Sequence, residues 1–234
     1  MRTVIATLAT GAALLLTSPA FSQEGCPDYA ADIAGIKPLE PKAFAGQLSE
    51  SDIRCLERGY ESAAKQTDKS KISRVLLANA QVTDSDEWVR LVRRHLDEVE
   101  RSDPDIAYMF ANFLFNQESP DFNTVVQFAD VAWERRTDRW EGRAFVVRSH
   151  HLLRMRSMSL MMLWKAEAEQ FAGSEQEPPT VANSRLKAHT AAREWLDFDR
   201  ASDLPFTEAA NLCVATGTES GCGLKPGWQK NSGT

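Results

Sequence analysis

The sequence lacks the short motifs that mark the common catalytic chemistries. It contains no HExxH zinc-protease motif, no GxSxG nucleophile motif and no glycine-rich phosphate loop. Its four histidines lie outside any recognisable catalytic pattern. These absences disfavour hydrolases and nucleotide-dependent enzymes. We therefore predict a protein without catalytic residues, without a metal site and without a cofactor.

The sequence is also short of positive charge, of long apolar runs and of strand-like patterns. Its 27 Lys and Arg residues face 33 Asp and Glu residues, which gives a net charge of −6. Nonspecific nucleic-acid binding depends on neutralising phosphates, so this balance argues against a nucleic-acid partner. Beyond the N-terminus, no apolar run reaches the roughly 20 residues that a membrane-spanning helix needs. No segment alternates apolar and polar residues for long, which predicts an all-α fold.

The N-terminal segment has the parts of a secretory signal peptide. Arg2 supplies a positive charge, an apolar stretch runs from Val4 to Leu16, and small residues precede a cleavage point near Ser22. An N-terminal anchor that is never cleaved is the alternative. We predict cleavage and a soluble protein that is periplasmic or secreted, with no membrane insertion after cleavage.

The cysteines form neither a CxxC pair nor zinc-finger spacing, which disfavours a thioredoxin-like redox site and a zinc finger. An even number of cysteines in an exported chain favours disulfides instead. Four cysteines allow three pairings. We favour Cys26–Cys55 and Cys213–Cys222, because each pair joins neighbours in the sequence.

Helical periodicity begins after an irregular N-terminal segment, in which "IKPLEPK" holds two prolines. Short breaks then separate apolar stripes at helical spacing, which favours antiparallel neighbours. Residues from Arg143 to about Gln170 include no Pro and no Gly, which predicts one long helix. The predicted organisation is a signal peptide (1–22), an irregular segment (23–47), a region of repeated helical hairpins (48–170), a loop (171–184), a C-terminal helical cap (185–216) and a flexible tail (217–234).

Two Ala-Asn sites indicate that one helical hairpin is written twice. "LLANAQ" and "MFANFL" place Asn79 and Asn112 33 residues apart. An offset of 34 residues relates the apolar pairs Trp88 and Phe122, Leu91 and Val125, and Val92 and Val126. This pattern resembles the tetratricopeptide repeat (TPR) family, whose unit of 34 residues is a helix, a turn and a helix. The Trp that opens the family's first helix is missing from both units, and a generic helical bundle with an accidental period is the alternative.

The resemblance implies a short α-solenoid of stacked hairpins with a concave face lined by the first helix of each unit. In TPR proteins an Asn on this face can hydrogen-bond the backbone of a bound peptide. Asn79 and Asn112 match that position and are candidate partner contacts, and Arg74 could reach an acidic group of the same partner. The alternative is an Asn that packs between helices and is satisfied inside the fold.

A methionine stripe lies within the predicted long helix. Met155, Met158 and Met162 recur at helical spacing. Thioether sulfurs suit Cu(I), so a copper carrier is one interpretation. The same spacing describes the buried face of a helix, in which Met fills gaps, and we favour that interpretation.

These features favour a non-catalytic interaction scaffold or adaptor of the bacterial envelope, which binds a protein or peptide partner in a preformed groove. Two alternatives belong to other classes. One is a cell-wall-active enzyme, for which Glu141 next to Trp140 is the candidate catalytic acid. The other is an immunity-type protein that neutralises a toxin.

Overall fold

The computed structural model describes residues 25–173 and 176–228. These residues form helices joined by turns, with no strand among them, so the predicted all-α class is confirmed. The predicted signal peptide (1–22) lies outside the described residues. The α-helices are α1 (Glu40–Phe44), α2 (Glu50–Ser62), α3 (Gln66–Thr83), α4 (Ser85–Arg94), α5 (Pro104–Phe115), α6 (Phe122–Arg135), α7 (Gly142–Gln170), α8 (Pro179–Ala201) and α9 (Thr207–Thr216). Two 3-10 helices, η1 (Ile33–Leu39) and η3 (Arg136–Asp138), and one π-helical segment, η2 (His95–Val99), complete the set.

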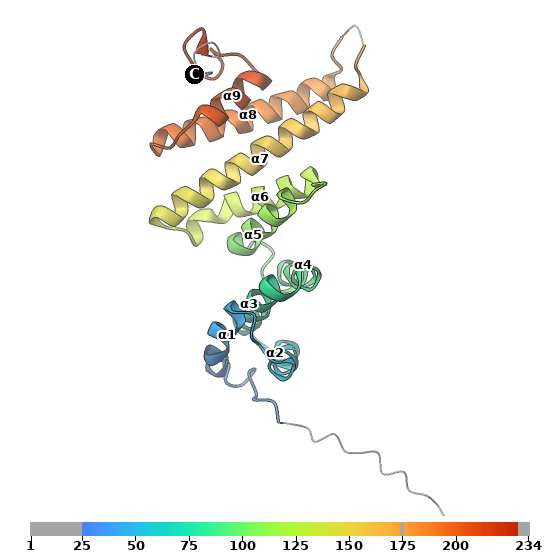
Figure 1. The fold of residues 1–234 in the computed structure, drawn as a ribbon, viewed down its shortest axis with the longest axis vertical. Coiled ribbons are helices and arrows are strands. Elements are labelled where there is room, and N and C mark those ends of the chain that lie inside the picture. The colour runs from blue at the N-terminus through green and yellow to red at the C-terminus, as the bar shows by residue number, and fades with distance from the viewer. Residues whose placement is uncertain (1–24, 174–175, 229–234) are drawn as a thin grey trace, which may run out of the picture.

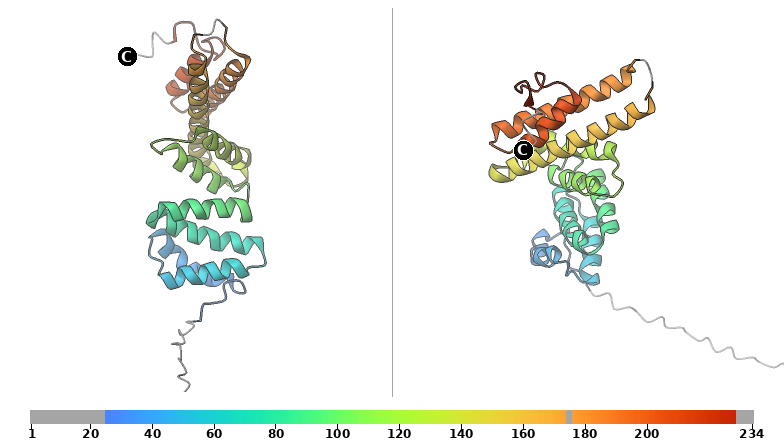
Figure 2. Two further views of the ribbon diagram at one scale, coloured as in Figure 1. Left: turned by 90° about the vertical axis from the view of Figure 1, so that its right-hand side faces the viewer. Right: turned by 45° about the horizontal axis from the view of Figure 1, so that its top comes forward.

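The helices are stacked along the long axis of an elongated molecule (Figure 1). Helices α1 to α4 form one end, and α7, α8 and α9 form the other. The views in Figure 2 show the same succession, with α2, α3 and α4 as adjacent layers. Each of the helices from α5 to α9 packs chiefly against its neighbour in the sequence. This is the arrangement expected when antiparallel helices are joined by short loops.

Polar side chains begin several helices at the breaks in the sequence pattern. Ser49 and Asp52 exchange hydrogen bonds with each other's backbone N–H groups in a capping box at the start of α2. Asp84, Asp103 and Asp121 each accept hydrogen bonds from two N–H groups in the first turn of α4, α5 and α6. Such caps satisfy N–H groups that have no partner within the helix.

The two aligned sequence units each form a helical hairpin. In the first unit, α3 is followed by α4, which continues into η2. In the second unit, α5 is followed by α6. The predicted long helix is present as α7, which begins one residue before the predicted start and ends at Gln170.

The apolar interior consists of three clusters along the molecule. The first joins the N-terminal segment to α5, the second joins α5, α6 and α7, and the third joins α7, α8, α9 and the C-terminal turns. Helix α7 links the last two, because Leu152 and Met155 belong to the middle cluster and Leu153 to the C-terminal one. The methionine stripe therefore begins in the core, whereas Met162 is 44% exposed.

Both predicted disulfides are confirmed. Cys26–Cys55 ties the N-terminal segment to α2, and Cys213–Cys222 ties the end of α9 to the turn that follows it. Disulfides of this kind persist in oxidising compartments. Within residues 25–173 and 176–228, every helix is too short or too polar to cross a membrane.

The predicted irregular segment (23–47) is wrong, because it contains η1 and α1. The two prolines disfavour an α-helix in the sequence pattern, but the structure accommodates both. Pro38 is accommodated within the 3-10 helix η1, and Pro41 occupies the first turn of α1, where a missing N–H costs no hydrogen bond.

The predicted loop (171–184) is too long and the predicted flexible tail (217–234) begins too early. Helix α8 starts at Pro179, which again occupies a first helical turn. Within the described part of the tail, Leu224 is buried, and Trp228 stacks on Phe206 with 5.8 Å between ring centroids. Packing against α8 and α9 thus orders a stretch whose composition alone favours a loop.

Candidate binding groove and side-chain clusters

The hairpin of α7 and α8 projects beyond the helix that covers its first half. Helix α6 has 14 residues, α7 has 29 and α8 has 23. At 1.5 Å per residue, α6 spans about 21 Å and α7 about 44 Å. Because α6 and α7 are antiparallel, α6 covers the N-terminal half of α7, and Figure 1 shows the tip of the α7–α8 hairpin standing clear of it.

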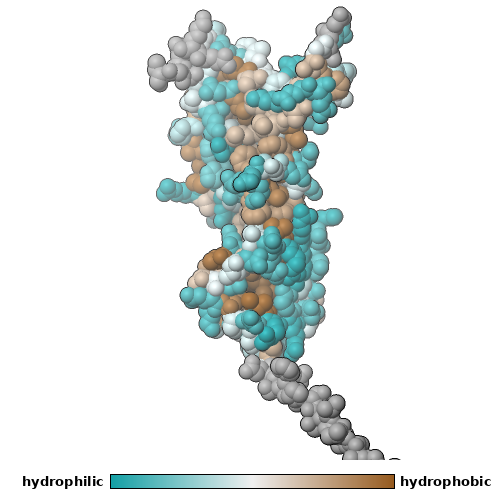
Figure 3. All heavy atoms as spheres, turned by 45° about the vertical axis from the view of Figure 1, so that its right-hand side comes forward, coloured by the Kyte–Doolittle hydropathy of each residue, from teal (hydrophilic) through white to brown (hydrophobic). Residues whose placement is uncertain are grey.

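A groove of about 870 Å³ lies beside the first turns of α6, where the α7–α8 hairpin continues beyond that helix. Its apolar floor contains Val126 of α6, Leu160 and Leu163 of α7, and Ala191 of α8. Polar side chains form the margins. Figure 3 shows hydrophobic patches along the middle of one face of the molecule, between hydrophilic borders. A volume of this size is in the range of functional binding sites.

The lining residues follow the same spacing on all three helices. On each helix a set of them recurs at steps of three and four residues, which is the spacing of the seam in a helical bundle, and adjacent lining residues widen this face on α7 and α8. The residues are Asn123, Val126 and Asp130 on α6, Arg156, Leu160, Leu163, Ala166, Glu167 and Gln170 on α7, and Ser184, Leu186, Lys187, Thr190 and Ala191 on α8. Three helices therefore present seam positions to a line that no fourth helix occupies within the described chain.

Ion pairs close one end of the groove. Arg156 bridges α6 and α8, because its Nε lies 2.6 Å from Asp130 Oδ1 and its guanidinium donates to Glu194 Oε2 at 2.6 Å. Burial raises the pKa of Asp130 above its usual value in spite of the neighbouring Arg156. Nearer the tip of the hairpin, the Ser184 hydroxyl donates to Glu167 and links α8 to α7.

The tip of the hairpin exposes large apolar side chains. Leu186 lines the groove and is 60% exposed, and Phe171 at the end of α7 is 42% exposed. Scattered exposed apolar residues are ordinary, but a group beside an apolar groove marks an interaction site more often than chance. The sequence does not single out this group, because apolar residues at helical spacing in α7 have the same pattern whether they are buried or exposed.

The structure places the three predicted contact residues in different surroundings. Asn79 is only 6% exposed, and its Oδ1 accepts a hydrogen bond from the Leu48 N–H at 3.2 Å. The Asn79 amide thus fastens the loop between α1 and α2, in agreement with the alternative of an internally satisfied Asn. Asn112 is exposed and lines a small pocket of about 280 Å³ beside Trp88. The predicted pairing of Asn79 with Asn112 on one open face is not what the structure shows.

Arg74 belongs to a buried polar network. Its guanidinium donates to Asp103, and its other terminal nitrogen lies 3.7 Å from Asp105. His95 bridges the same network, with Nδ1 3.0 Å from Ser73 Oγ and Nε2 3.1 Å from Asp103 Oδ2. Burial favours a raised pKa for Asp103, but the hydrogen bond from His95 and the charge of Arg74 outweigh it and hold that pKa below its usual value.

Ser73, His95 and Asp103 are hydrogen-bonded in the same sequence as the Ser-His-Asp triad of hydrolases, yet their burial favours a structural role. A nucleophile needs access for its substrate, and all three side chains are fully buried. His95, Glu100 and Asp103 also bring potential metal ligands together. Arg74 already balances Asp103, and Arg139 binds Glu100 at 3.1 Å, so the carboxylates of this cluster have cations.

Glu141, the candidate acid of a cell-wall enzyme, has no exposed aromatic neighbour in Trp140 on which a sugar could stack. Glu141 is exposed and precedes α7. The Trp140 indole is buried, donates to Asp105 Oδ1 at 2.8 Å and packs edge-on against Tyr108 with centroids 5.5 Å apart. Trp140 therefore offers no open face on which a sugar could stack.

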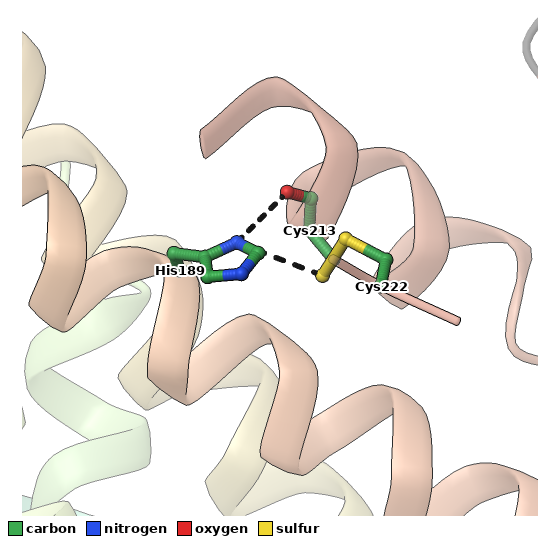
Figure 4. Close-up of side chains that lie close together, drawn as sticks. All are labelled: His189, Cys213 and Cys222. Atoms are coloured by element: carbon green, nitrogen blue, oxygen red, sulfur yellow. Dashed lines mark hydrogen bonds between the residues drawn. A yellow bond between two sulfur atoms is a disulfide. The ribbon is translucent and has the colours of Figure 1, made fainter. Parts of the chain in front are cut away.

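A third cluster joins α8 to the C-terminal disulfide (Figure 4). His189 points from α8 toward Cys213, with Nδ1 3.2 Å from the Cys213 carbonyl oxygen and 3.8 Å from Cys213 Sγ. His189 and Cys213 are 24 residues apart in the chain, and Cys213 and Cys222 are 9 residues apart, so the fold brings the three side chains together.

Comparison of the chain with protein-family models, with curated proteins and with solved structures finds no match.

Proposed function

We propose that this protein is an exported, non-catalytic interaction scaffold that holds a helical segment of a partner protein in the groove between α6, α7 and α8. The observation that carries the proposal is the shared seam spacing of the three lining helices. A helix from a partner would complete a four-helix arrangement, in which apolar seam residues of the fourth helix meet those of the other three.

The dimensions of the groove define the partner segment. The lining of α7 runs from Arg156 to Gln170, a rise of about 21 Å, which corresponds to about four helical turns. The partner segment would carry apolar residues at steps of three and four, facing Val126, Leu160 and Leu163. Lys187, which is exposed at the margin, favours an acidic residue on the partner.

The TPR-like interpretation and the location in the envelope belong to the same proposal. Two consecutive hairpins, α3 with α4 and α5 with α6, support a repeated unit, and the α7–α8 hairpin extends the series. The two disulfides support an oxidising compartment such as the periplasm.

Burial of a few apolar side chains of the partner helix, each worth about 1.5–3 kcal/mol, is offset in part by the loss of translational freedom on binding. We therefore expect affinities in the micromolar range, about −8 kcal/mol.

The proposal is tested with a synthetic amphipathic helix that carries Leu at the seam positions of three heptads. Binding is measured by fluorescence anisotropy of the labelled peptide. Leu186→Glu places a charge in the groove and should weaken binding at least tenfold. Val82→Glu is the matched control, because Val82 is also 60% exposed but lies on α3, outside the groove.

A peptide of the same composition in shuffled order should bind at least tenfold more weakly, because its apolar residues no longer form one stripe. Equal binding of both peptides, or equal weakening by Leu186→Glu and Val82→Glu, would show that the groove does not recognise an amphipathic helix.

A further inference from the structure

His189, Cys213 and Cys222 are arranged like three ligands of one metal ion. One ring nitrogen and the two sulfurs all lie within 4.8 Å of one another. They come from α8, from α9 and from the turn after α9, so the fold assembles them from separate elements (Figure 4). In the described structure the two sulfurs are joined in a disulfide and do not bind metal.

The position of the His189 ring depends on glycines in the adjacent loop. A Cβ atom at Gly217 would lie 2.3 Å from Cε1 and 2.4 Å from Nδ1 of His189, a contact that real side chains do not make. A Cβ atom at Gly221 would lie 3.7 Å from Nε2. The loop therefore closes directly over the ring, and Gly217 is required for the approach of His189 to the disulfide.

The other disulfide, Cys26–Cys55, has no such neighbour. In the part of the chain that the structure covers, no His, Asp or Glu side chain joins Cys26 and Cys55 in a comparable group of three. The His189 arrangement is thus a property of one disulfide and not of disulfides in this fold generally.

We propose that reduction of Cys213–Cys222 creates a binding site for one thiophilic divalent cation of the Zn²⁺ class, with His189 and the two thiolates as ligands. Two sulfurs and one imidazole nitrogen suit zinc, and three protein ligands leave a fourth position for water. The oxidised protein does not bind the ion through these residues, so the site is gated by the redox state of the disulfide.

The reaction balances with a dithiol as the reductant. The dithiol transfers two electrons and two protons to the disulfide, so the S–S bond breaks, two thiols form and the reductant becomes a disulfide. Binding of Zn²⁺ then releases the two thiol protons, and two metal–sulfur bonds form. His189 contributes the lone pair of its unprotonated ring nitrogen; when Nδ1 binds the metal, the ring proton is on Nε2 and the hydrogen bond from Nδ1 to the Cys213 carbonyl oxygen is given up. Because both sulfurs are buried, the reductant reaches them only when the turn after α9 opens locally.

The test uses Co²⁺ as a spectroscopic probe and the full chain carrying Cys26→Ser and Cys55→Ser, in which only the C-terminal disulfide is present. A phosphine reductant is added and removed without oxygen, and Co²⁺ is then titrated. The reduced protein should bind one Co²⁺, give thiolate-to-cobalt absorption and exchange it for Zn²⁺. The oxidised protein should show none of this absorption.

The reciprocal variant, with Cys213→Ser and Cys222→Ser, retains the other cysteine pair and should lose the absorption. His189→Ala should weaken Co²⁺ binding at least tenfold. Any of three results overturns the proposal: absorption that survives in the reciprocal variant, unchanged affinity in His189→Ala, or a reduced protein that binds no Co²⁺. Loss of the helical circular dichroism signal on reduction also overturns it, because the site needs the folded frame.

Discussion

At the scale of single residues, Asp103 links three helical elements of the N-terminal half. It caps α5 through Oδ1 and accepts hydrogen bonds from His95 and Arg74 through Oδ2. One carboxylate thus joins α3, η2 and α5. Its depressed pKa indicates that the folded structure favours the charged form.

Asp103→Asn should lower the free energy of unfolding by about 3–5 kcal/mol at pH 7, because it leaves the partly buried charge of Arg74 without its main partner. Urea denaturation measures this loss. Asp121→Asn is the matched control, because Asp121 caps α6 with the same geometry but is exposed, and its loss should be much smaller. Equal losses in the two variants would reduce Asp103 to an ordinary cap.

The same variant has a predicted pH dependence. Because the folded-state pKa of Asp103 lies below the unfolded value of about 3.9, its stabilisation is fully present above that value and is lost as the pH falls through the folded pKa. The difference in stability between the natural chain and Asp103→Asn should therefore shrink below about pH 4. A difference that stays constant from pH 7 to pH 3 would contradict the assignment.

Local sequence patterns indicate contacts between residues that are near in the chain, and the Cys26–Cys55 disulfide was predictable only because cysteines in an exported chain pair with each other. The caps at Ser49 and Asp84 bond only to the next three residues, so a local pattern can indicate such positions. The partner of Asn79 is the Leu48 backbone, 31 residues away, and the partner of His150 is Asp199, 49 residues away. No local pattern encodes such pairs, because they depend on how the helices pack.

At the scale of elements, α7 connects the middle and C-terminal clusters by close helix packing. Ser149, Ser157 and Ser159 are fully buried on it, and small side chains at such positions let neighbouring helices approach. The Ser159 hydroxyl has no hydrogen-bond partner among the described residues. Removing a buried unsatisfied hydroxyl without a change of size should stabilise the fold.

Ser159→Ala should raise the free energy of unfolding by about 1 kcal/mol, whereas Ser159→Leu should lower it by about 1–3 kcal/mol because the site has no room. Both values come from urea denaturation. A destabilised Ser159→Ala protein would indicate that the hydroxyl is satisfied in solution.

The long helix α7 was predicted because a helix signal needs only the absence of breakers and a regular pattern. The groove along it could not be predicted in the same way. Leu160 and Leu163 have the spacing of core residues, and whether another helix covers them depends on the length and direction of α6. The pattern indicated an apolar face but not the missing neighbour.

At the scale of the whole molecule, three clusters in series make the two ends energetically distinct, and each end carries one disulfide. Loss of a disulfide costs more when it closes a longer loop. Cys26–Cys55 spans 29 residues and Cys213–Cys222 spans 9. The chain-entropy relation gives about 3.6 and about 2.6 kcal/mol, respectively.

Replacing both cysteines of the first pair by Ser should therefore speed amide hydrogen exchange in α2 and α3 more than in α8 and α9. Replacing the second pair should produce the reverse pattern, with a smaller effect. Uniform acceleration along the whole chain in either variant would mean that the three clusters unfold as one unit.

The overall shape also separates two possible binding faces. The resemblance to repeat proteins predicts a binding face on the first helices of the hairpins, with Arg74, Asn79 and Asn112. The structure uses Asn79 and Arg74 largely for internal contacts and leaves an apolar groove at the other end, along α7. The proposed function depends on that groove.

The most direct measurement is nuclear magnetic resonance mapping of the labelled protein during titration with the amphipathic helical peptide. We predict chemical-shift changes that cluster on Val126, Leu160, Leu163 and Ala191 and that disappear in Leu186→Glu. Changes centred on Arg74 and Asn112, or spread evenly over the surface, would contradict the account.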